Sequence, residues 1–222
     1  MNNNNFKFII CGTDTDVGKT LISSFFVRGL NSFYWKPIQS GIFEETDSKV
    51  VKRLSQIKSN RIIKEAYIFK EPVSPHWASE IDQIKIEMKS LDLPKVNESL
   101  VLETAGGLMV PITRNFLQID QIKIWNLPVI IVCRSSLGTL NHTLLSIEAL
   151  KKRGIKILGL VINGVNHLDN PRTLKEFSNL PIIAEFPFLK KIDCSILDRL
   201  WQELNIKRNL DSIFKSKIFD EE

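Results

Sequence analysis

Apolar runs of strand length recur along the chain and alternate with amphipathic segments. The longer runs are nearly continuous, as expected of parallel strands that are covered on both faces. Two shorter runs, at residues 33–36 and 182–185, are also mostly apolar. We expect strands at residues 6–11, 33–36, 99–103, 129–134, 157–163 and 182–185.

Between these strands, apolar residues recur at helical spacing, as they do from Leu21 to Leu30. The segment at residues 140–153 joins two predicted strands and would form a right-handed βαβ unit with them. Residues 60–75 are too mixed in pattern to assign. We expect helices at residues 19–30, 47–56, 140–153 and 196–204.

These elements predict a single doubly wound α/β domain with a mostly parallel central sheet. A length of 222 residues suits one sizeable domain with its own core. There is no internal repeat and no linker, so we assign residues 6–222 to this domain. The polar lead at residues 1–5 is expected to be disordered.

Residues that suggest chemistry follow the predicted strands repeatedly. In an open parallel sheet, ligands bind outside the carboxyl ends of the strands. We therefore expect one crevice that gathers several stretches distant in sequence. The stretches that follow the strands lie at residues 12–20, 36–41, 103–107, 135–141 and 163–164.

Composition narrows the classes of partner. The net charge of +5 is mild and the basic residues are scattered, so we expect no nucleic acid. No apolar run approaches the roughly 18 residues that span a membrane, so we expect no membrane partner and a cytoplasmic location. Three cysteines, odd in number and far apart, predict no disulfide framework. Cys11 and Cys133 end apolar strands and are predicted to be buried thiols.

The sequence CGTDTDVGKT at residues 11–20 departs from the usual phosphate loop. That pattern has four residues before Gly-Lys-Ser/Thr, whereas five separate Gly12 from Gly18 here. The loop still lies between a predicted strand and a predicted helix, whose first N–H groups bind phosphate. Lys19 would reach the β and γ oxygens, and Thr20 would coordinate Mg²⁺. A glycine-rich turn without a ligand is the alternative.

Three further charged residues lie at the same edge. Glu103 ends a buried strand, where a carboxylate is costly without a partner. Asp47 begins a helix and would either bind a metal or cap that helix. Lys36 would either stabilise negative charge on a substrate or be a solvated surface lysine. Together with Thr20, the two carboxylates would form a magnesium site.

Eight motifs together resemble one family. They are GTDTDVGKT, KPIQSG, EPVSPH, ETAGGLMVPIT, NLPVIIV, SLGTLNHTLL, GLVING and AEFPFL, and they extend from Gly12 to Leu189. The set, with its five-residue loop spacing, is typical of the dethiobiotin synthetases, ATP-dependent carbon–nitrogen cyclo-ligases of biotin biosynthesis with a P-loop NTPase-like fold. The resemblance implies that 7,8-diaminononanoate, CO₂ and ATP give dethiobiotin, ADP and phosphate, through a carbamate and a carbamic–phosphoric anhydride.

The resemblance also implies site residues and a homodimer with the substrate site at the subunit interface. The metal ligands would be Thr20, Asp47 and Glu103. The catalytic residues would be Lys36, Lys19 and Thr15. The substrate would contact Thr15, Asp16, Lys36, Ser40 and, at a helix start that receives its carboxylate, Gly138, Thr139, Leu140 and Asn141. The nucleotide would contact Asp16, Val17, Gly18, Lys19, Thr20, Leu21, Glu103, Thr104, Ala105, Gly106, Asn163, Gly164, Pro187, Phe188 and Leu189.

Two departures and three alternatives remain at this point. Thr104 stands where the family has glycine, so it would be strained if that position needs a left-handed backbone. The match ends at Leu189, and the amphipathic stretch beyond it would be a packing helix or a membrane-surface helix. The alternative functions are an ATP-driven switch that dimerises on a membrane or DNA, a glutamine-dependent amide ligase, and a non-catalytic nucleotide-binding module. In the switch proteins a second lysine stands where this chain has Asp14.

Overall fold

The computed structural model describes residues 5–42 and 44–218. Of the lead predicted to be disordered, residues 1–4 lie outside the described residues. Asn5 is described, and its side-chain amide donates a hydrogen bond to the carbonyl of Asn97 at 2.6 Å.

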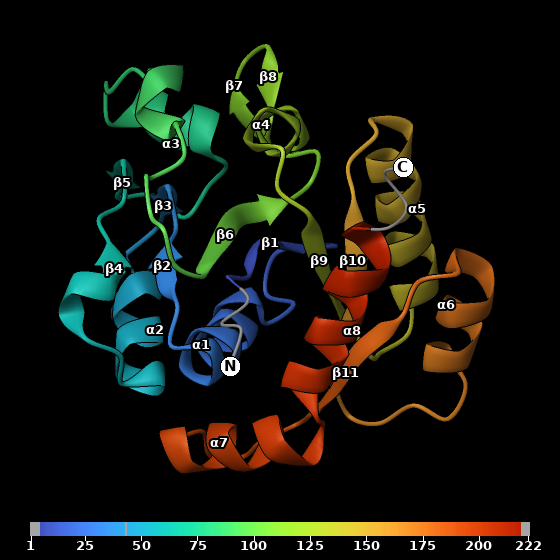
Figure 1. The fold of residues 1–222 in the computed structure, drawn as a ribbon. Helices are drawn as coiled ribbons and strands as arrows, with labels where there is room; N and C mark the ends of the chain where they lie inside the picture. Colours follow the sequence, from blue (N-terminus) through green and yellow to red (C-terminus); the bar gives the residue numbers. More distant parts are fainter. Residues whose placement is uncertain (1–4, 43, 219–222) are drawn as a thin grey trace.

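A seven-stranded sheet forms the centre of the fold (Figure 1), and every pair of neighbouring strands in it runs parallel. Its strands are, in spatial order, β11 (Ile182–Pro187), β10 (Ile157–Gly164), β9 (Val129–Arg134), β1 (Lys7–Gly12), β6 (Leu100–Gly107), β2 (Phe33–Trp35) and β4 (Ile62–Ile63). After β1, the chain first forms the strands on one side of it (β2, β4 and β6) and then those on the other side (β9, β10 and β11). This is the doubly wound order that the sequence predicts.

Helices cover both faces of this sheet because alternate side chains of its strands point to opposite faces. In β1, Phe8 and Ile10 belong to one buried cluster, while Ile9 and Cys11 belong to another. The first cluster contains residues of α1 (Lys19–Leu30), α2 (Asp47–Ser55), α7 (Cys194–Glu203) and α8 (Ile206–Ile218). The second contains residues of α4 (Gln118–Trp125), α5 (Thr139–Lys152) and α6 (Asn170–Ser178).

A small third cluster packs beside the carboxyl end of β6. It joins the distant side chains Ile38, Phe69, Ala78 and Ala105. An ion pair from Arg114 to Glu80, with N···O 2.6 Å, also links this region. The elements around it are β3 (Ile38–Ser40), β5 (Tyr67–Phe69), α3 (Pro75–Ile81), β7 (Pro111–Thr113), β8 (Phe116–Leu117) and a 3₁₀ turn at Met88–Leu91. A second 3₁₀ turn, at Ser59–Arg61, precedes β4, and its Arg61 lies over the ring of Phe33.

The sequence pattern predicts the central elements well and the peripheral ones poorly. The six predicted strands and four predicted helices all exist, with ends that shift by a few residues. The largest shift is in β6, which continues to Gly107, so the prediction that Glu103 ends its strand is wrong. The pattern did not predict β3, β4, β5, β7, β8, α3, α4 or α6.

The C-terminal segment packs on the body of the domain. Trp201 lies edge-on to Phe25 with ring centroids 5.3 Å apart, and Phe214 lies edge-on to Phe6 at 5.1 Å. These contacts bury the apolar face of α7 and α8, which confirms the packing alternative for this stretch. Within residues 5–42 and 44–218, no helix is both long and apolar enough to cross a bilayer.

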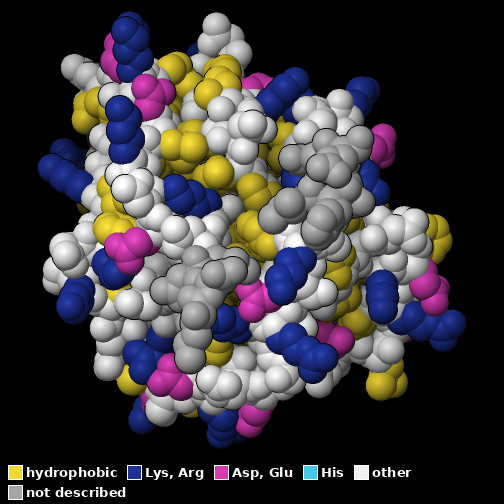
Figure 2. All heavy atoms as spheres, viewed as in Figure 1, with side chains coloured by type: hydrophobic (Ala, Val, Ile, Leu, Met, Phe, Trp, Pro, Cys, Tyr) yellow, Lys and Arg dark blue, Asp and Glu magenta, His cyan; other side chains and the backbone are white. Residues whose placement is uncertain are grey.

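The burial of the cysteines and the distribution of the basic residues both agree with the sequence predictions. Cys11 and Cys133 are fully buried free thiols, and burial raises the pKa of Cys11 to about 12. Figure 2 shows Lys and Arg side chains scattered over one face of the molecule and mixed with Asp and Glu.

Candidate active site

The loop between β1 and α1 turns on two glycines that admit no side chain. A Cβ on Gly12 would lie 2.8 Å from Val17 Cγ2 and 2.9 Å from the carbonyl oxygen of Asp14. Gly18 has φ +96°, and its Cβ would lie 2.1 Å from Asn163 Nδ2. Both glycines are therefore needed for this loop conformation.

Lys19 points back along this loop. Its side chain is buried, and its Nζ donates to the carbonyl oxygen of Asp14 at 2.9 Å. Burial, and after it the nearby ammonium of Lys36, lowers the pKa of Lys19. The lysine thus lies under the five-residue segment that distinguishes this loop from the usual one.

The residues Asp14, Thr15 and Asp16, which we call the acidic segment, are exposed, whereas Val17 after them is buried. Asp14 Oδ1 accepts a hydrogen bond from the Thr15 N–H at 2.7 Å. Asp16 has φ 55°, a left-handed conformation in which the chain turns sharply. The segment therefore forms an exposed turn outside the buried part of the loop.

Arg134, at the carboxyl end of β9, binds this acidic segment. Its Nη2 donates to the Thr15 carbonyl oxygen at 2.8 Å and to Asp14 Oδ2 at 3.5 Å. The sequence pattern did not identify Arg134 as a site residue. The signal was available, because Arg134 ends a predicted strand in the same way as Lys36.

A buried carboxylate lies on the other side of Thr20. Glu103 is fully buried. Its Oε1 accepts hydrogen bonds from Thr20 Oγ1 at 2.9 Å and from Lys36 Nζ at 3.3 Å. Its Oε2 accepts one from the hydroxyl of Tyr34 at 2.9 Å. A buried carboxylate needs such donors. Two segments distant in sequence supply them, the start of α1 with Thr20 and the β2 segment with Tyr34 and Lys36.

Lys36 joins Glu103 to a second carboxylate, that of Asp47. Lys36 is buried and its ammonium pairs with Asp47 Oδ2 as well as with Glu103. Burial disfavours the charged form, but the two carboxylates outweigh it and raise the pKa of Lys36. The alternative of a solvated surface lysine is therefore wrong. We call Thr20, Tyr34, Lys36, Asp47 and Glu103 the buried ionic cluster.

Asp47 does not cap its helix. The N-cap of α2 is Thr46, and Asp47 is the first helical residue. Its backbone N–H donates to Gln39 Oε1 at 3.2 Å, which ties the helix start to β3. This position leaves the carboxylate of Asp47 directed at Lys36.

Thr20, Asp47 and Glu103 present one hydroxyl and two carboxylates, all hard oxygen donors of the kind that Mg²⁺ takes. Within the described part of the chain, no group of three or more His, Cys, Asp or Glu could hold a metal. A metal here would complete its shell with waters and phosphate oxygens, which is how Mg²⁺ is usually bound beside nucleotides. The residues present therefore fit Mg²⁺.

The remaining predicted residues of β6 have different surroundings, and Gly106 is the one that lies beside the acidic segment. Thr104 is not among the described residues with positive φ, and its hydroxyl donates to the Ile10 carbonyl at 3.5 Å. The predicted condition for strain at Thr104 is therefore absent. Gly106 has φ +64°, and a Cβ there would lie 3.8 Å from Thr15 Oγ1. Ala105 packs into the third cluster, and Ser40 Oγ is buried without a partner among the described residues.

A second group of predicted residues meets at the edge formed by β10 and β11. Asn163 Nδ2 donates to the Val17 carbonyl oxygen at 2.9 Å, which brings β10 against the loop. The sheet register pairs Gly164 with Pro187. Phe188 is 68% exposed, whereas the side chains of Leu21 and Leu189 pack against the first cluster. The structure therefore places the two stretches of predicted nucleotide-binding residues, at β10 and β11, side by side.

The predicted carboxylate-binding residues form the start of α5. Gly138 is the N-cap with φ 91°, Thr139 is buried, and Asn141 is exposed. Leu140 is partly buried against the second cluster. This helix start follows β9, the strand that ends at Arg134.

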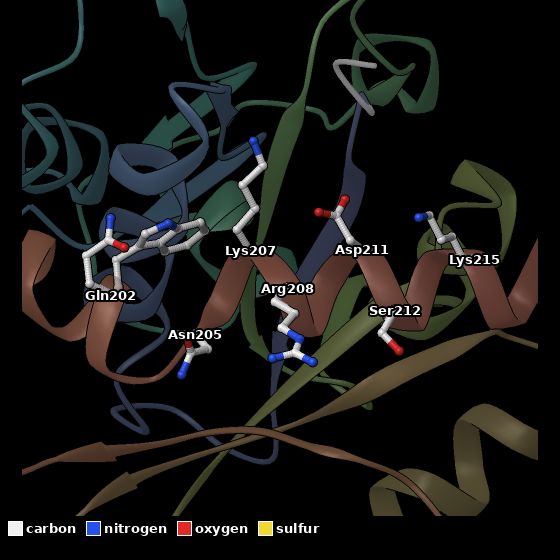
Figure 3. A pocket seen from close by; sticks show the side chains of 8 residues that line it. Gln202, Asn205, Lys207, Arg208, Asp211, Ser212 and Lys215 are labelled. Atoms are coloured by element: carbon white, nitrogen blue, oxygen red, sulfur yellow. The ribbon is translucent and has the colours of Figure 1, made fainter. Parts of the chain in front are cut away.

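The groove in Figure 3 lies elsewhere, along α7 and α8. Its lining residues belong to the stretch from Trp201 to Lys215 and include none of the predicted site residues. Lys207 and Asp211 project from one side of α8, and Arg208 and Ser212 project from another.

The chain is similar in sequence to proteins of known name. A family model described as an AAA domain matches residues 7–194. The ATP-dependent dethiobiotin synthetase BioD of Rhodopseudomonas palustris (strain TIE-1) is 43% identical over 191 residues, which cover 86% of this chain and 90% of that protein. This chain belongs to the dethiobiotin synthetase family. The resemblance found in its motifs is thereby confirmed.

Two further relatives carry the same name. The protein of Brucella anthropi is 42% identical over 199 residues, covering 90% of this chain and 94% of its own length. That of Bradyrhizobium diazoefficiens is 43% identical over 186 residues, covering 83% and 88%. The sequence match therefore covers most of this chain and most of each relative.

Solved structures show the likeness of the fold. A ParA family ATPase from Chlorobium tepidum TLS matches with a TM-score of 0.51 at 11% identity, covering 96% of this chain and 98% of that chain. A putative plasmid partition protein from Borrelia burgdorferi B31 bound to AMPPNP matches with a TM-score of 0.50 at 13% identity, covering 96% and 100%. These matches confirm the P-loop NTPase-like fold. The alternative of a switch ATPase rests on this fold alone, whereas the relatives in sequence are dethiobiotin synthetases.

Proposed function

We propose that this chain is an ATP-dependent dethiobiotin synthetase that closes the ureido ring of dethiobiotin from 7,8-diaminononanoate and CO₂. The buried ionic cluster is the observation that carries the assignment to this site. It joins the phosphate loop, through Thr20, to Glu103, Lys36 and Asp47. Phosphoryl transfer depends on positioning and on neutralising charge, and this cluster offers groups for both.

The proposed reaction has three steps. One amine of the substrate adds to CO₂ and loses a proton, giving a carbamate. A carbamate oxygen then takes the γ-phosphoryl group, the bond to the β-phosphate oxygen breaks, and ADP leaves. Finally the second amine attacks the carbonyl carbon of the mixed anhydride, loses a proton and expels phosphate, which closes the ring.

Thr20, Asp47 and Glu103 would hold Mg²⁺, which when bound neutralises charge on the phosphate oxygens. Lys19 would bind the β and γ oxygens from the start of α1. Lys36 would face the carbamate and the phosphoryl group that it accepts. An ammonium group in a buried site stabilises developing negative charge more strongly than one in water.

The acidic segment would bind the diamine. Thr15 and Asp16 are exposed, and Thr15 lies beside Gly106 and Arg134. Carboxylates attract the ammonium form of an amine. Ser40 would contact the carbamate. The start of α5, from Gly138 to Asn141, would receive the carboxylate of the substrate in the second subunit of a homodimer, since a helix N-terminus favours an anion.

The nucleotide would extend from the loop to the edge formed by β10 and β11. Val17, Gly18 and Leu21 would contact it at the loop, and Thr104, Ala105 and Gly106 would contact it at β6. Asn163 and Gly164, paired in the sheet with Phe186 and Pro187, would lie along the base with Phe188 and Leu189. A cytoplasmic location stays a prediction.

The direct test supplies the purified chain with 7,8-diaminononanoate, bicarbonate, ATP and Mg²⁺, and measures dethiobiotin by mass spectrometry. Dethiobiotin should form with one ADP per product and should fail to form when any one component is withheld. If the folded chain binds ATP but yields no dethiobiotin at saturating substrates, the proposal is wrong.

A further inference from the structure

Tyr34 is a buried polar residue that the proposed function does not use. It lies in β2, next to β6, and the register pairs it with Val101. Its ring is fully buried in the first cluster, and its hydroxyl reaches along β6 to Glu103 Oε2 at 2.9 Å. A phenylalanine would fill the same space without a buried hydroxyl that needs a partner, so packing does not explain the hydroxyl.

The two oxygens of Glu103 have different partners. Oε1 faces Thr20 at 2.9 Å and Lys36 at 3.3 Å, and Oε2 faces Tyr34. The terminal torsion of a glutamate is broad, so packing alone defines it poorly. A donor on Oε2 fixes the plane of the carboxylate and leaves Oε1 toward Thr20.

The neutral hydroxyl of Tyr34 suits this task. Lys36 also binds Glu103, but it binds the same oxygen as Thr20. A second cation on Oε2 would compete with a metal for the charge of the carboxylate, whereas a phenol adds a hydrogen bond without adding charge. Removing a group that holds a metal ligand in this way commonly weakens metal binding by roughly 10- to 100-fold. We expect a loss of this order when the hydroxyl of Tyr34 is removed.

We propose that Tyr34 is a positioning residue, whose hydroxyl holds Glu103 Oε2 so that Oε1 is presented to the metal site beside Thr20. The proposal rests on the proposed function in assigning Glu103 to Mg²⁺. It goes beyond that function in naming the residue that orients this ligand.

The test compares Tyr34→Phe with Tyr67→Phe, the substitutions of the two tyrosines in the chain. Tyr67 is a matched control, because its hydroxyl accepts from the Glu87 N–H at 2.7 Å, outside the buried ionic cluster. Mn²⁺ binding in the presence of AMPPNP is measured by electron paramagnetic resonance, without the diamine. Tyr34→Phe should weaken Mn²⁺ binding by about 10-fold, and Tyr67→Phe should leave it unchanged.

Steady-state kinetics separates positioning from general damage. In Tyr34→Phe, the Mg²⁺ concentration for half-maximal rate should rise about 10-fold, and the KM for the diamine should stay that of the wild type. In the Glu103→Gln background, Tyr34→Phe should add no further loss of Mn²⁺ binding, because the two residues act as one unit. Wild-type Mn²⁺ affinity in Tyr34→Phe, or additive losses, would overturn the proposal.

A second measurement covers the case in which Tyr34→Phe does not fold. In the Tyr67→Phe chain, Tyr34 is the sole tyrosine, so incorporated 3-fluorotyrosine gives one ¹⁹F signal. This signal should shift when Mg²⁺ is added to the complex with AMPPNP. An unmoved signal at saturating Mg²⁺ would also overturn the proposal. A wild-type chain that binds Mn²⁺ but makes no dethiobiotin would instead overturn the proposed function.

Discussion

Two groups of acidic residues lie in and beside the phosphate loop, and they differ in burial and in the way their carboxylates are held. Asp47 and Glu103 belong to the buried ionic cluster and share the ammonium of Lys36. Asp14 and Asp16 belong to the exposed acidic segment, where Asp14 lies 3.5 Å from the guanidinium of Arg134. Carboxylates at one loop are therefore held in two ways, because burial demands a fixed partner whereas an exposed carboxylate is also solvated by water.

The largest effect is expected from removing the cation of the buried ionic cluster. Lys36→Met should lower kcat by about 10²- to 10³-fold, the usual loss when a group that stabilises developing charge is removed. ATP affinity, measured by calorimetry, should stay close to that of the wild type. Lys52→Met, at an exposed position of α2, is the control and should change neither quantity. If Lys36→Met lost ATP affinity as much as kcat, Lys36 would be a binding residue instead.

The comparison is sharpest between Asp47→Asn and Asp14→Asn, which remove one carboxylate from each group. Asp47→Asn should weaken Mn²⁺ binding in the presence of AMPPNP by about 10-fold or more. Asp14→Asn should leave Mn²⁺ binding unchanged, because that carboxylate lies in the exposed acidic segment. Equal losses in the two variants would remove the distinction between the two groups.

A smaller effect is expected at Asp16. Asp16→Asn should raise the KM for the diamine about fivefold, which is the size of an exposed ion-pair contribution, and should spare ATP affinity. Initial rates with varied diamine and calorimetry with ATP give the two quantities. The reverse pattern, with weaker ATP binding and an unchanged KM, would show that the acidic segment belongs to the nucleotide side.

The smallest of these effects is expected for Cys11→Ala. It concerns how the unfolding free energy changes with pH under alkaline conditions. The pKa of Cys11 is raised by burial from 9.0 to about 12, so the folded chain retains a proton that the unfolded chain loses. Stability from this group is complete below pH 9.0 and is lost progressively as the pH rises toward 12.

Urea unfolding at several values between pH 8.0 and about 10 isolates this contribution, since unperturbed Tyr and Lys ionise near or above the upper limit. The unfolding free energy of Cys11→Ala should fall less steeply with pH than that of the wild type. The packing lost with the side chain lowers this free energy equally at every pH, so it does not change the slope. Cys194→Ala, at a partly exposed position, should follow the wild type. Parallel slopes for all three chains would contradict the assignment to Cys11.

The sequence was most informative where apolar runs are long and buried on both faces. Such runs identify β1, β6, β9 and β10. The polar residues in or after β1, β2 and β6 identified Thr20, Lys36 and Glu103 as neighbours. The elements that it missed are short or weakly apolar. In α6, Leu174 is the one residue that joins a core cluster, and β3 and β5 are three-residue strands that pair with each other.

Tyr34 and Arg134 were missed for another reason. Both contacts depend on which segments the sheet brings side by side, β2 with β6 for Tyr34 and β9 with the loop after β1 for Arg134. Periodicity in one strand carries no such information. Tyr34 reads as an ordinary apolar strand residue until β2 is placed beside β6. Asp47 was ambiguous between cap and ligand until the structure showed Thr46 at the cap.

The hydrogen bond from Asn163 to the Val17 carbonyl oxygen has a consequence for engineering. The same amide nitrogen occupies the space that a Cβ on Gly18 would need. In the proposed placement of the nucleotide, redesigning Asn163 to accept a different base would therefore also loosen the loop between β1 and α1, so altered selectivity would come with slower turnover. A combinatorial library aimed at nucleotide choice should vary Asn163 together with Val17, hold Gly18 fixed, and score each clone on both traits.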